Sequence, residues 1–198
     1  QYSWHLKYVR QMLESEDLHP AGALSLMILD EGPLFIADTQ VYPEPTVEQL
    51  TWTIKAAARH VRRFGLEPNI ALCSNSQFGN LQTEAADRIR AAIRQLEDDN
   101  CDFVFEGEMQ LDAALDAELR HRIFPNSRLK GNANVVIFSN SETSSAVRNA
   151  LKSVSGGLEV GPILMGMGNR AHIVTPSITV RGLINIAALA GTPVQHYA

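Results

Sequence analysis

Strand patterns alternate with helix patterns along the chain, and this alternation constrains the fold more than any other feature. Strand-length apolar runs lie at Ala23–Leu29, Leu34–Ala37, Ile70–Ser74, Asp102–Glu106, Asn134–Phe138, Pro162–Met165 and His172–Val174. Helical spacing predicts helices over Ser3–Leu13, Thr46–Phe64, Thr83–Asp98, Leu115–Ile123, Ser141–Val154 and Thr179–Ala190. Because parallel strands need long crossover connections, the sequence predicts an α/β fold with a largely parallel sheet.

The helix over Thr46–Phe64 has the clearest signals at both ends. Thr46 and Gln49 form a capping box, and Gly65 is placed as the left-handed residue that ends the helix. Its apolar residues repeat every three or four positions and form one stripe. This stripe and the one on Ser141–Val154 suit either a core or an interface between subunits.

Composition excludes several classes of protein. The chain has 17 Lys and Arg against 22 Asp and Glu, a net charge of −5, which argues against non-specific nucleic-acid binding. No apolar run approaches the about 20 residues of a membrane helix. Cys73 and Cys101 lie far apart in apolar stretches, which indicates buried thiols in a reducing compartment, and we expect a cytoplasmic protein. The six histidines have no metal-ligand spacing, so no metal site is expected.

Polar residues gather near the ends of the predicted strands. The segments 74–77 and 106–110 follow strands, whereas 130–134 precedes one. Ligands of open α/β sheets bind beyond the carboxyl ends of strands, so the first two segments are candidate ligand contacts. The alternative is that the polar residues of these segments form only turns and helix caps, which use the same residue types. Glu106 and Glu108 could form a carboxylate pair, although alternate residues of a strand share a face without any chemistry.

Taken in order, the motifs resemble the phosphate acetyltransferase (phosphotransacetylase) family. The resemblance runs from Gly22 to Ala190, and its C-terminal part is similar to the phosphotransacetylase-like domain of bacterial hybrid NADP-dependent malic enzymes. It is carried by 34–39 (LFIADT), 45–49 (PTVEQ), 64–68 (FGLEP), 106–110 (EGEMQ), 128–135 (RLKGNANV), 161–166 (GPILMG) and 171–189. It implies a two-lobed α/β fold related to isocitrate dehydrogenases, with coenzyme A between the lobes. On this basis 1–21 begins the outer lobe, which is incomplete in this chain. Residues 22–160 form the inserted lobe, and 161–198 return to the outer lobe.

One departure from the family motif decides the expected function. Active members carry Ser-Arg-Gly-Cys-Ser and, two residues on, an Asp that deprotonates the coenzyme A thiol, while the Arg holds acetyl phosphate. Here Thr175 stands for the Ser, Pro176 for the Arg and Gly182 for the Asp. The resemblance therefore implies no catalytic residue and a domain that keeps acetyl-CoA as an allosteric ligand. Two alternatives remain: an active acetyltransferase that recruits His172 or Glu108, and a purely structural dimerisation domain.

The resemblance also indicates ligand-binding residues and partners. Thr175, Ser177, Lys130 and Asn134 match positions that line the acetyl-CoA cleft, and Ser74 and Ser76 are expected on the facing wall; Asp38 is expected to close a turn. We expect a homo-oligomer, at least a dimer through the inserted lobe. The same parent chain would carry a malic enzyme domain that holds NADP and a divalent metal and converts malate to pyruvate and CO2.

Overall fold

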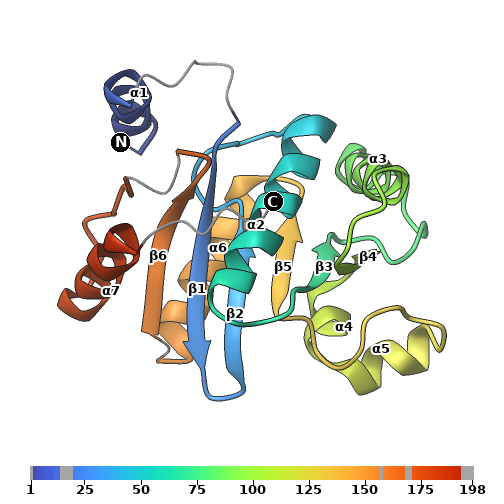
Figure 1. Cartoon of the computed structure of the whole chain (residues 1–198). Helices are drawn as coiled ribbons and strands as arrows, with labels where there is room; N and C mark the ends of the chain where they lie inside the picture. The colour runs from blue at the N-terminus through green and yellow to red at the C-terminus, as the bar shows by residue number, and fades with distance from the viewer. Residues whose placement is uncertain (1, 14–19, 157, 168–170, 193–198) are drawn as a thin grey trace.

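The computed structural model describes residues 2–13, 20–156, 158–167 and 171–192, in which six strands form one sheet and seven helices accompany it (Figure 1). The strands are β1 (Gly22–Leu29), β2 (Gly32–Ala37), β3 (Asn69–Cys73), β4 (Val104–Met109), β5 (Val135–Phe138) and β6 (Leu158–Met165). The helices are α1 (Tyr2–Met12), α2 (Val47–Arg63), α3 (Glu84–Asp98), α4 (Leu111–Leu115), α5 (Ala117–Ile123), α6 (Ser141–Val154) and α7 (Val180–Gly191).

The sheet has the strand order β4-β3-β5-β2-β1-β6. The pairs from β4 to β2 are parallel, and those of β1 with β2 and with β6 are antiparallel. The predicted α/β fold with a mostly parallel sheet is therefore confirmed. β1 and β2 form a hairpin because a turn at Asp30–Glu31 joins them directly, whereas each parallel pair is connected through helices.

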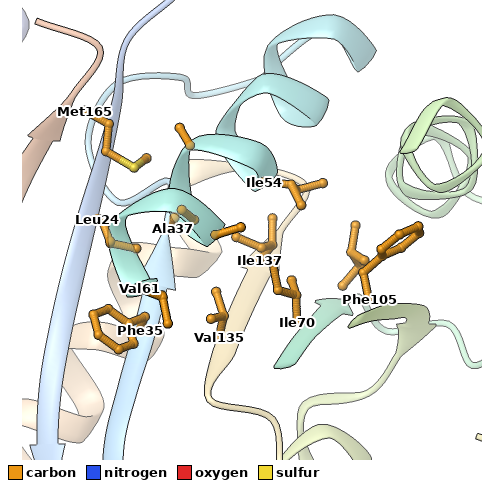
Figure 2. Close-up of a cluster of buried hydrophobic side chains, with 14 of the residues drawn as sticks. Leu24, Phe35, Ala37, Ile54, Val61, Ile70, Phe105, Val135, Ile137 and Met165 are labelled. Carbon is orange, nitrogen blue, oxygen red and sulfur yellow. The ribbon is translucent and has the colours of Figure 1, made fainter. Parts of the chain in front are cut away.

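Helices cover both faces of the sheet. Side chains of α2 and α3 pack with one face in the larger apolar cluster, and those of α4 and α6 pack with the other face. Figure 2 shows Ile54 and Val61 of α2 directed at Phe35, Val135 and Ile137 of the sheet. The apolar stripe of α2 is thus part of the core of this chain rather than a free interface. A fully buried side chain of this kind contributes about 1.5–3 kcal/mol.

The ends of α2 agree with the sequence prediction in detail. Thr46 accepts from the Gln49 N–H, and Gln49 Oε1 accepts from the Thr46 N–H. Gly65 has φ of +73°, the left-handed conformation that glycine adopts most easily. Asn140 caps α6 and Thr179 caps α7, each by accepting from the backbone N–H three residues further along the chain.

Several predicted elements differ in the structure. β6 begins at Leu158, four residues before the predicted Pro162. β4 runs from Val104 to Met109 instead of from 102 to 106. Its buried Glu106 and Glu108 accept hydrogen bonds from neighbouring loops, so both carboxylates can lie within the strand. The segment 115–123 contains the end of α4 and all of α5, because Asp116 ends one helix and caps the next. Residues 172–174 form no strand, and the segment is tied to β6 through the His172 ring, which accepts from the Leu164 N–H.

The three expected regions 1–21, 22–160 and 161–198 stay a prediction. The expected boundary after residue 160 falls within β6, whose residues on both sides pair with β1. Residues 1, 14–19, 157, 168–170 and 193–198 of these regions lie outside the described residues. None of the described helices has the length and apolar character needed to cross a membrane.

Candidate functional site

A cleft of about 380 Å³ lies between α1 and the segment that leads into α7. Tyr2 and His5 line it from α1, and Thr175, Pro176 and Ile178 line it from the segment. The hydroxyl groups of Thr175 and Ser177 are 3.0 Å apart and hydrogen-bond to each other. Two of the predicted site residues therefore lie together beside a cleft.

The hydroxyl group of Tyr2 is buried and has no hydrogen-bond partner among the described residues. Burial, and then the charge of Asp38, raises the pKa of Tyr2. A buried hydroxyl without a partner costs about 1–3 kcal/mol. Tyr2 therefore contributes a buried, unsatisfied hydroxyl group to the packing beside the cleft.

Asp38 serves the turn after β2, as the sequence predicts. Its carboxylate accepts from the backbone N–H groups of Ala23, Gln40, Val41 and Tyr42 at 2.8–3.2 Å. Burial raises the pKa of Asp38, and these four N–H groups oppose the increase. The bonds join the start of β1 to the end of β2.

Position 182 has little room for a side chain. A Cβ atom on Gly182 would lie 3.1 Å from Ile178 Cγ1, 3.2 Å from Thr179 Oγ1 and 3.3 Å from the Glu159 carbonyl oxygen. The Gly182 N–H donates to Thr179 Oγ1, which is the capping bond of α7. The first turn of α7 is therefore closely packed where a larger residue would stand.

His172 lies on the same segment but its ring is already engaged. Nδ1 accepts from the Leu164 N–H at 3.1 Å, and Nε2 is buried without a hydrogen-bond partner among the described residues. Burial, and then the charge of Arg63, lowers the pKa of His172, which favours the neutral ring. Because Nδ1 accepts, the neutral ring carries its proton on Nε2.

The other predicted site residues lie elsewhere. Ser74 and Ser76 follow the carboxyl end of β3, and Ser76 donates to Glu108 at 2.7 Å. Asn134 precedes β5 and lies beside the amino end of β3. There its side chain accepts from the Asn69 N–H and donates to the Glu67 carbonyl oxygen. The Lys130 carbonyl oxygen accepts from Asn69 at this end. The structure thus does not bring Asn134 and Lys130 together with Ser74 and Ser76, and their contact with a ligand stays a prediction.

A family model for phosphate acetyl/butaryl transferases matches residues 1–191, nearly the whole chain. The chain belongs to this family. It is 38% identical over 196 residues to an NAD-dependent malic enzyme of Rhizobium meliloti and 39% identical over 196 residues to an NADP-dependent malic enzyme of Salmonella typhimurium. Each alignment covers 98% of this chain and 26% of the relative, so the chain spans about a quarter of the malic enzymes it matches.

The fold agrees with solved structures of the same family. A phosphotransacetylase from Streptococcus pyogenes superimposes with a TM-score of 0.84 and 21% identity, over 96% of this chain and 59% of that protein. The malic enzyme relatives include both nucleotide preferences at nearly equal identity. The expected preference for NADP therefore stays a prediction.

A network of charged side chains holds in place the segment that leads into α7 and lines the first cleft. Lys152 of α6 donates to the Ser177 carbonyl oxygen at 3.0 Å and to Glu159 of β6 at 2.9 Å. Glu159 also lies 3.4 Å from Arg148, and the side chains of both are less than 10% exposed. Sequence reasoning missed Lys152, Glu159 and Tyr2, because nothing in their local sequence indicates which distant residue each contacts.

We expect the Lys152→Met variant to loosen this segment. Loss of a charge-assisted bond at a partly exposed site costs about 1 kcal/mol, so the amides of 174–178 should exchange with deuterium about fivefold to tenfold faster. Hydrogen exchange read by mass spectrometry measures this directly. Lys130→Met, a change of the same kind at an exposed lysine, is the control. Equal exchange in both variants would contradict the fastening role of Lys152.

The described residues contain no cluster of three or more His, Cys, Asp or Glu side chains placed to hold a metal ion. Cys73 is buried and Cys101 is partly exposed, and neither forms a disulfide. Burial raises the pKa of both thiols. The predicted burial is confirmed for Cys73 but is wrong for Cys101, which is only partly buried.

Proposed function

We propose that this chain is the phosphotransacetylase-like region of a malic enzyme and binds acetyl-CoA as an allosteric ligand without transferring its acetyl group. The parent enzyme would oxidise and decarboxylate malate to pyruvate in a separate domain, which would hold the nicotinamide nucleotide and the divalent metal. The family match and the coverage of about a quarter of two malic enzymes support this assignment.

The close packing at Gly182 carries the proposal. The resemblance matches this position to the aspartate that deprotonates the thiol of coenzyme A. An aspartate Cβ atom here would require Ile178, Thr179 and the Glu159 carbonyl group to move by a few tenths of an ångström. This packing of the first turn of α7 supports a site that works without the base.

The chemistry explains why such a cleft would retain acetyl-CoA. A thiol has a pKa of about 8.5, so only a few per cent is thiolate at neutral pH. A general base contributes about 10²–10⁴-fold to the rate. Pro176 also replaces the arginine that holds acetyl phosphate in active members, and a proline side chain has no donor for a phosphate oxygen. Without both groups, turnover should be negligible.

The geometry disfavours both substitute bases. Neutral His172 carries its proton on Nε2, while its Nδ1 lone pair accepts from the Leu164 N–H. Glu108 lies on β4, at the opposite edge of the sheet from β6. Five strand spacings separate these edges, which is about 24 Å. Neither group is placed to receive a proton at Thr175.

Exposed apolar side chains on α1 and α7 support a position inside a larger protein. Trp4 and Tyr8 on α1 are about half exposed, as is Leu183 on α7. Val180 and Ile184 of α7 are 78% and 63% exposed. Since α7 buries mainly Gly182 and Ile186, most of its apolar surface faces away from this chain. We infer that the remainder of the parent covers these helices and completes the outer lobe.

Calorimetric titration of the full-length parent enzyme with acetyl-CoA tests the binding. We expect a saturable heat and a decrease in malate oxidation on saturation. Such coupling between sites is typically about 1–3 kcal/mol, or 5–150-fold in affinity. No heat at millimolar acetyl-CoA would contradict the proposal. Rapid formation of acetyl phosphate from acetyl-CoA and phosphate would instead favour the active transferase.

Thr175→Val locates the ligand in this cleft. It removes a hydroxyl group without changing the volume, and loss of one hydrogen bond should raise the Kd of acetyl-CoA by about threefold to tenfold. Thr192→Val makes the same change at the exposed end of α7, outside this cleft, and should leave the Kd unchanged. Equal Kd values for the two variants would place the ligand elsewhere.

A further inference from the structure

A second cleft, of about 480 Å³, lies at the carboxyl ends of the parallel strands. Its walls come from the residues after β3, β4 and β5 and from the N-terminal parts of α3 and α6. The proposed acetyl-CoA cleft is instead formed by α1 and the segment before α7. The two clefts share no lining residue, and Ser74, which the resemblance placed on the wall of the acetyl-CoA cleft, lines this one.

The topology of the sheet makes this position suitable for a ligand. β3 and β5 are neighbours, but β3 leads into α3 on one face and β5 leads into α6 on the other. Figure 1 shows these two connections leaving on opposite sides of the sheet. Where the connections of adjacent parallel strands diverge, a crevice opens between the loops, and open α/β sheets bind their ligands there.

The lining combines an apolar interior with amide groups. Cys73 and Phe138 are at most 5% exposed and form the buried part of the lining, and Leu111 and Val147 add further apolar surface. Asn75, Gln110 and Asn140 contribute side-chain amides. Such a lining, with mostly apolar walls and a few placed polar groups, is typical of sites for small organic molecules.

Two of the amides keep hydrogen-bonding groups free for a ligand. Asn140 Oδ1 accepts from the Thr143 N–H at 2.8 Å, and no group of the described residues bonds to its Nδ2. Gln110 Nε2 donates to the Asn75 carbonyl oxygen at 3.2 Å, and no described donor reaches its Oε1. The residues that line the cleft therefore include one amide donor and one amide acceptor without a partner among the described residues.

The charge balance argues against an ionic ligand. No Asp, Glu, Lys, Arg or His lines the cleft within the described residues. Arg88 donates to the Ser139 carbonyl oxygen behind the cleft, but Glu44 and Glu84 pair with it. At the start of α6, the Ser141 and Thr143 N–H groups already donate to Tyr42 and Asn140. A charge moved into the cleft would lose hydration without gaining a counter-charge, which is unfavourable.

We propose that this cleft binds an uncharged heteroaromatic group of nucleobase size. A planar ring stacks on apolar walls, and the ring edge offers the acceptor and donor that Asn140 Nδ2 and Gln110 Oε1 need. Asparagine and glutamine amides pair with nucleobase edges in the same way elsewhere. The proposal does not depend on acetyl-CoA binding or on the catalytic state of the domain.

Adenosine titrated into the ¹⁵N-labelled chain is the direct test. We expect saturable shifts of the side-chain amide signals of Asn75, Gln110 and Asn140. Ala85→Leu fills the cleft from α3 and should weaken binding at least tenfold. Ala91→Leu makes the same change elsewhere on α3 and should leave binding unchanged. Asn140→Ser keeps a capping oxygen for α6 but removes the amide donor, so it should weaken binding about threefold to tenfold.

A matched pair of probes tests the charge preference. Nicotinamide and nicotinate have nearly the same size, but only nicotinate is charged at pH 7. We expect nicotinamide to bind at least tenfold more tightly at the same amide signals. No saturable shift with adenosine, shifts confined to the segment 173–178, equal binding of the two probes, or equal effects of the two α3 variants would each overturn the proposal.

Discussion

Replacement of Arg120 by methionine is expected to lower the free energy of unfolding by about 3–5 kcal/mol. Arg120 is 2% exposed, and its guanidinium group donates to the carbonyl oxygens of four residues and to the Ser127 hydroxyl. The four carbonyl groups belong to Ala113, Ala114, Leu129 and Gly131. Methionine has a similar length but no donor, so these oxygens would lose a partner inside the protein.

Urea unfolding at pH 7 measures this effect, and Arg122→Met is its control. Arg122 is exposed on the same helix, α5, and its replacement should change the free energy of unfolding by about 0.5 kcal/mol or less. A loss below about 1 kcal/mol for Arg120→Met would show that the guanidinium group does not hold the loop after α5 in place.

Replacement of Glu108 by glutamine is expected to cost about 2–4 kcal/mol at pH 7. The Glu108 side chain is 1% exposed. Its Oε1 accepts from the Ser76 hydroxyl, the Gly79 N–H and Arg90, each at 2.7 Å. Glutamine keeps one oxygen that can accept from these donors but is neutral, so the bond from Arg90 loses its charge-charge attraction and the other two bonds weaken.

The pH dependence of this effect has a definite sign. Burial raises the pKa of Glu108, but the bonds from Ser76 and Gly79 and the charge of Arg90 outweigh it, so the pKa lies below its ordinary value of 4.5. A carboxylate with a lowered folded-state pKa stabilises the fold fully above the ordinary value, and this contribution is lost as pH falls through the folded-state pKa. The difference between wild type and Glu108→Gln should therefore be largest near pH 7 and shrink below pH 4.5.

Urea unfolding at several pH values measures this difference. Glu118→Gln, at an exposed position of α5, is the control and should show little effect at any pH. A difference for Glu108→Gln that stays constant from pH 7 to pH 3.5 would mean that the carboxylate charge does not contribute.

The segment 106–108 shows why the local sequence pattern could not predict the hydrogen-bond partners of the polar residues. The sequence left open whether Glu106 and Glu108 form a pair. In the structure Glu106 accepts from Ser127 and from the Arg128 N–H, whereas Glu108 accepts from Ser76 and Gly79. Each carboxylate therefore holds a different loop against β4, and its loop partners lie 21 or more residues away in the chain.

The sequence alone determined the class of fold and most helix ends, as at Thr46 and Gly65. These features depend on apolar periodicity and on caps formed by residues three or four positions apart, so a short stretch of chain contains their whole cause. The tertiary structure alone decided that Asn134 and Ser74 lie at opposite ends of β3, that Lys152 holds the Ser177 carbonyl group, and that Gly182 is enclosed. Those facts depend on contacts between distant segments, which form only when the strands take their order in the sheet.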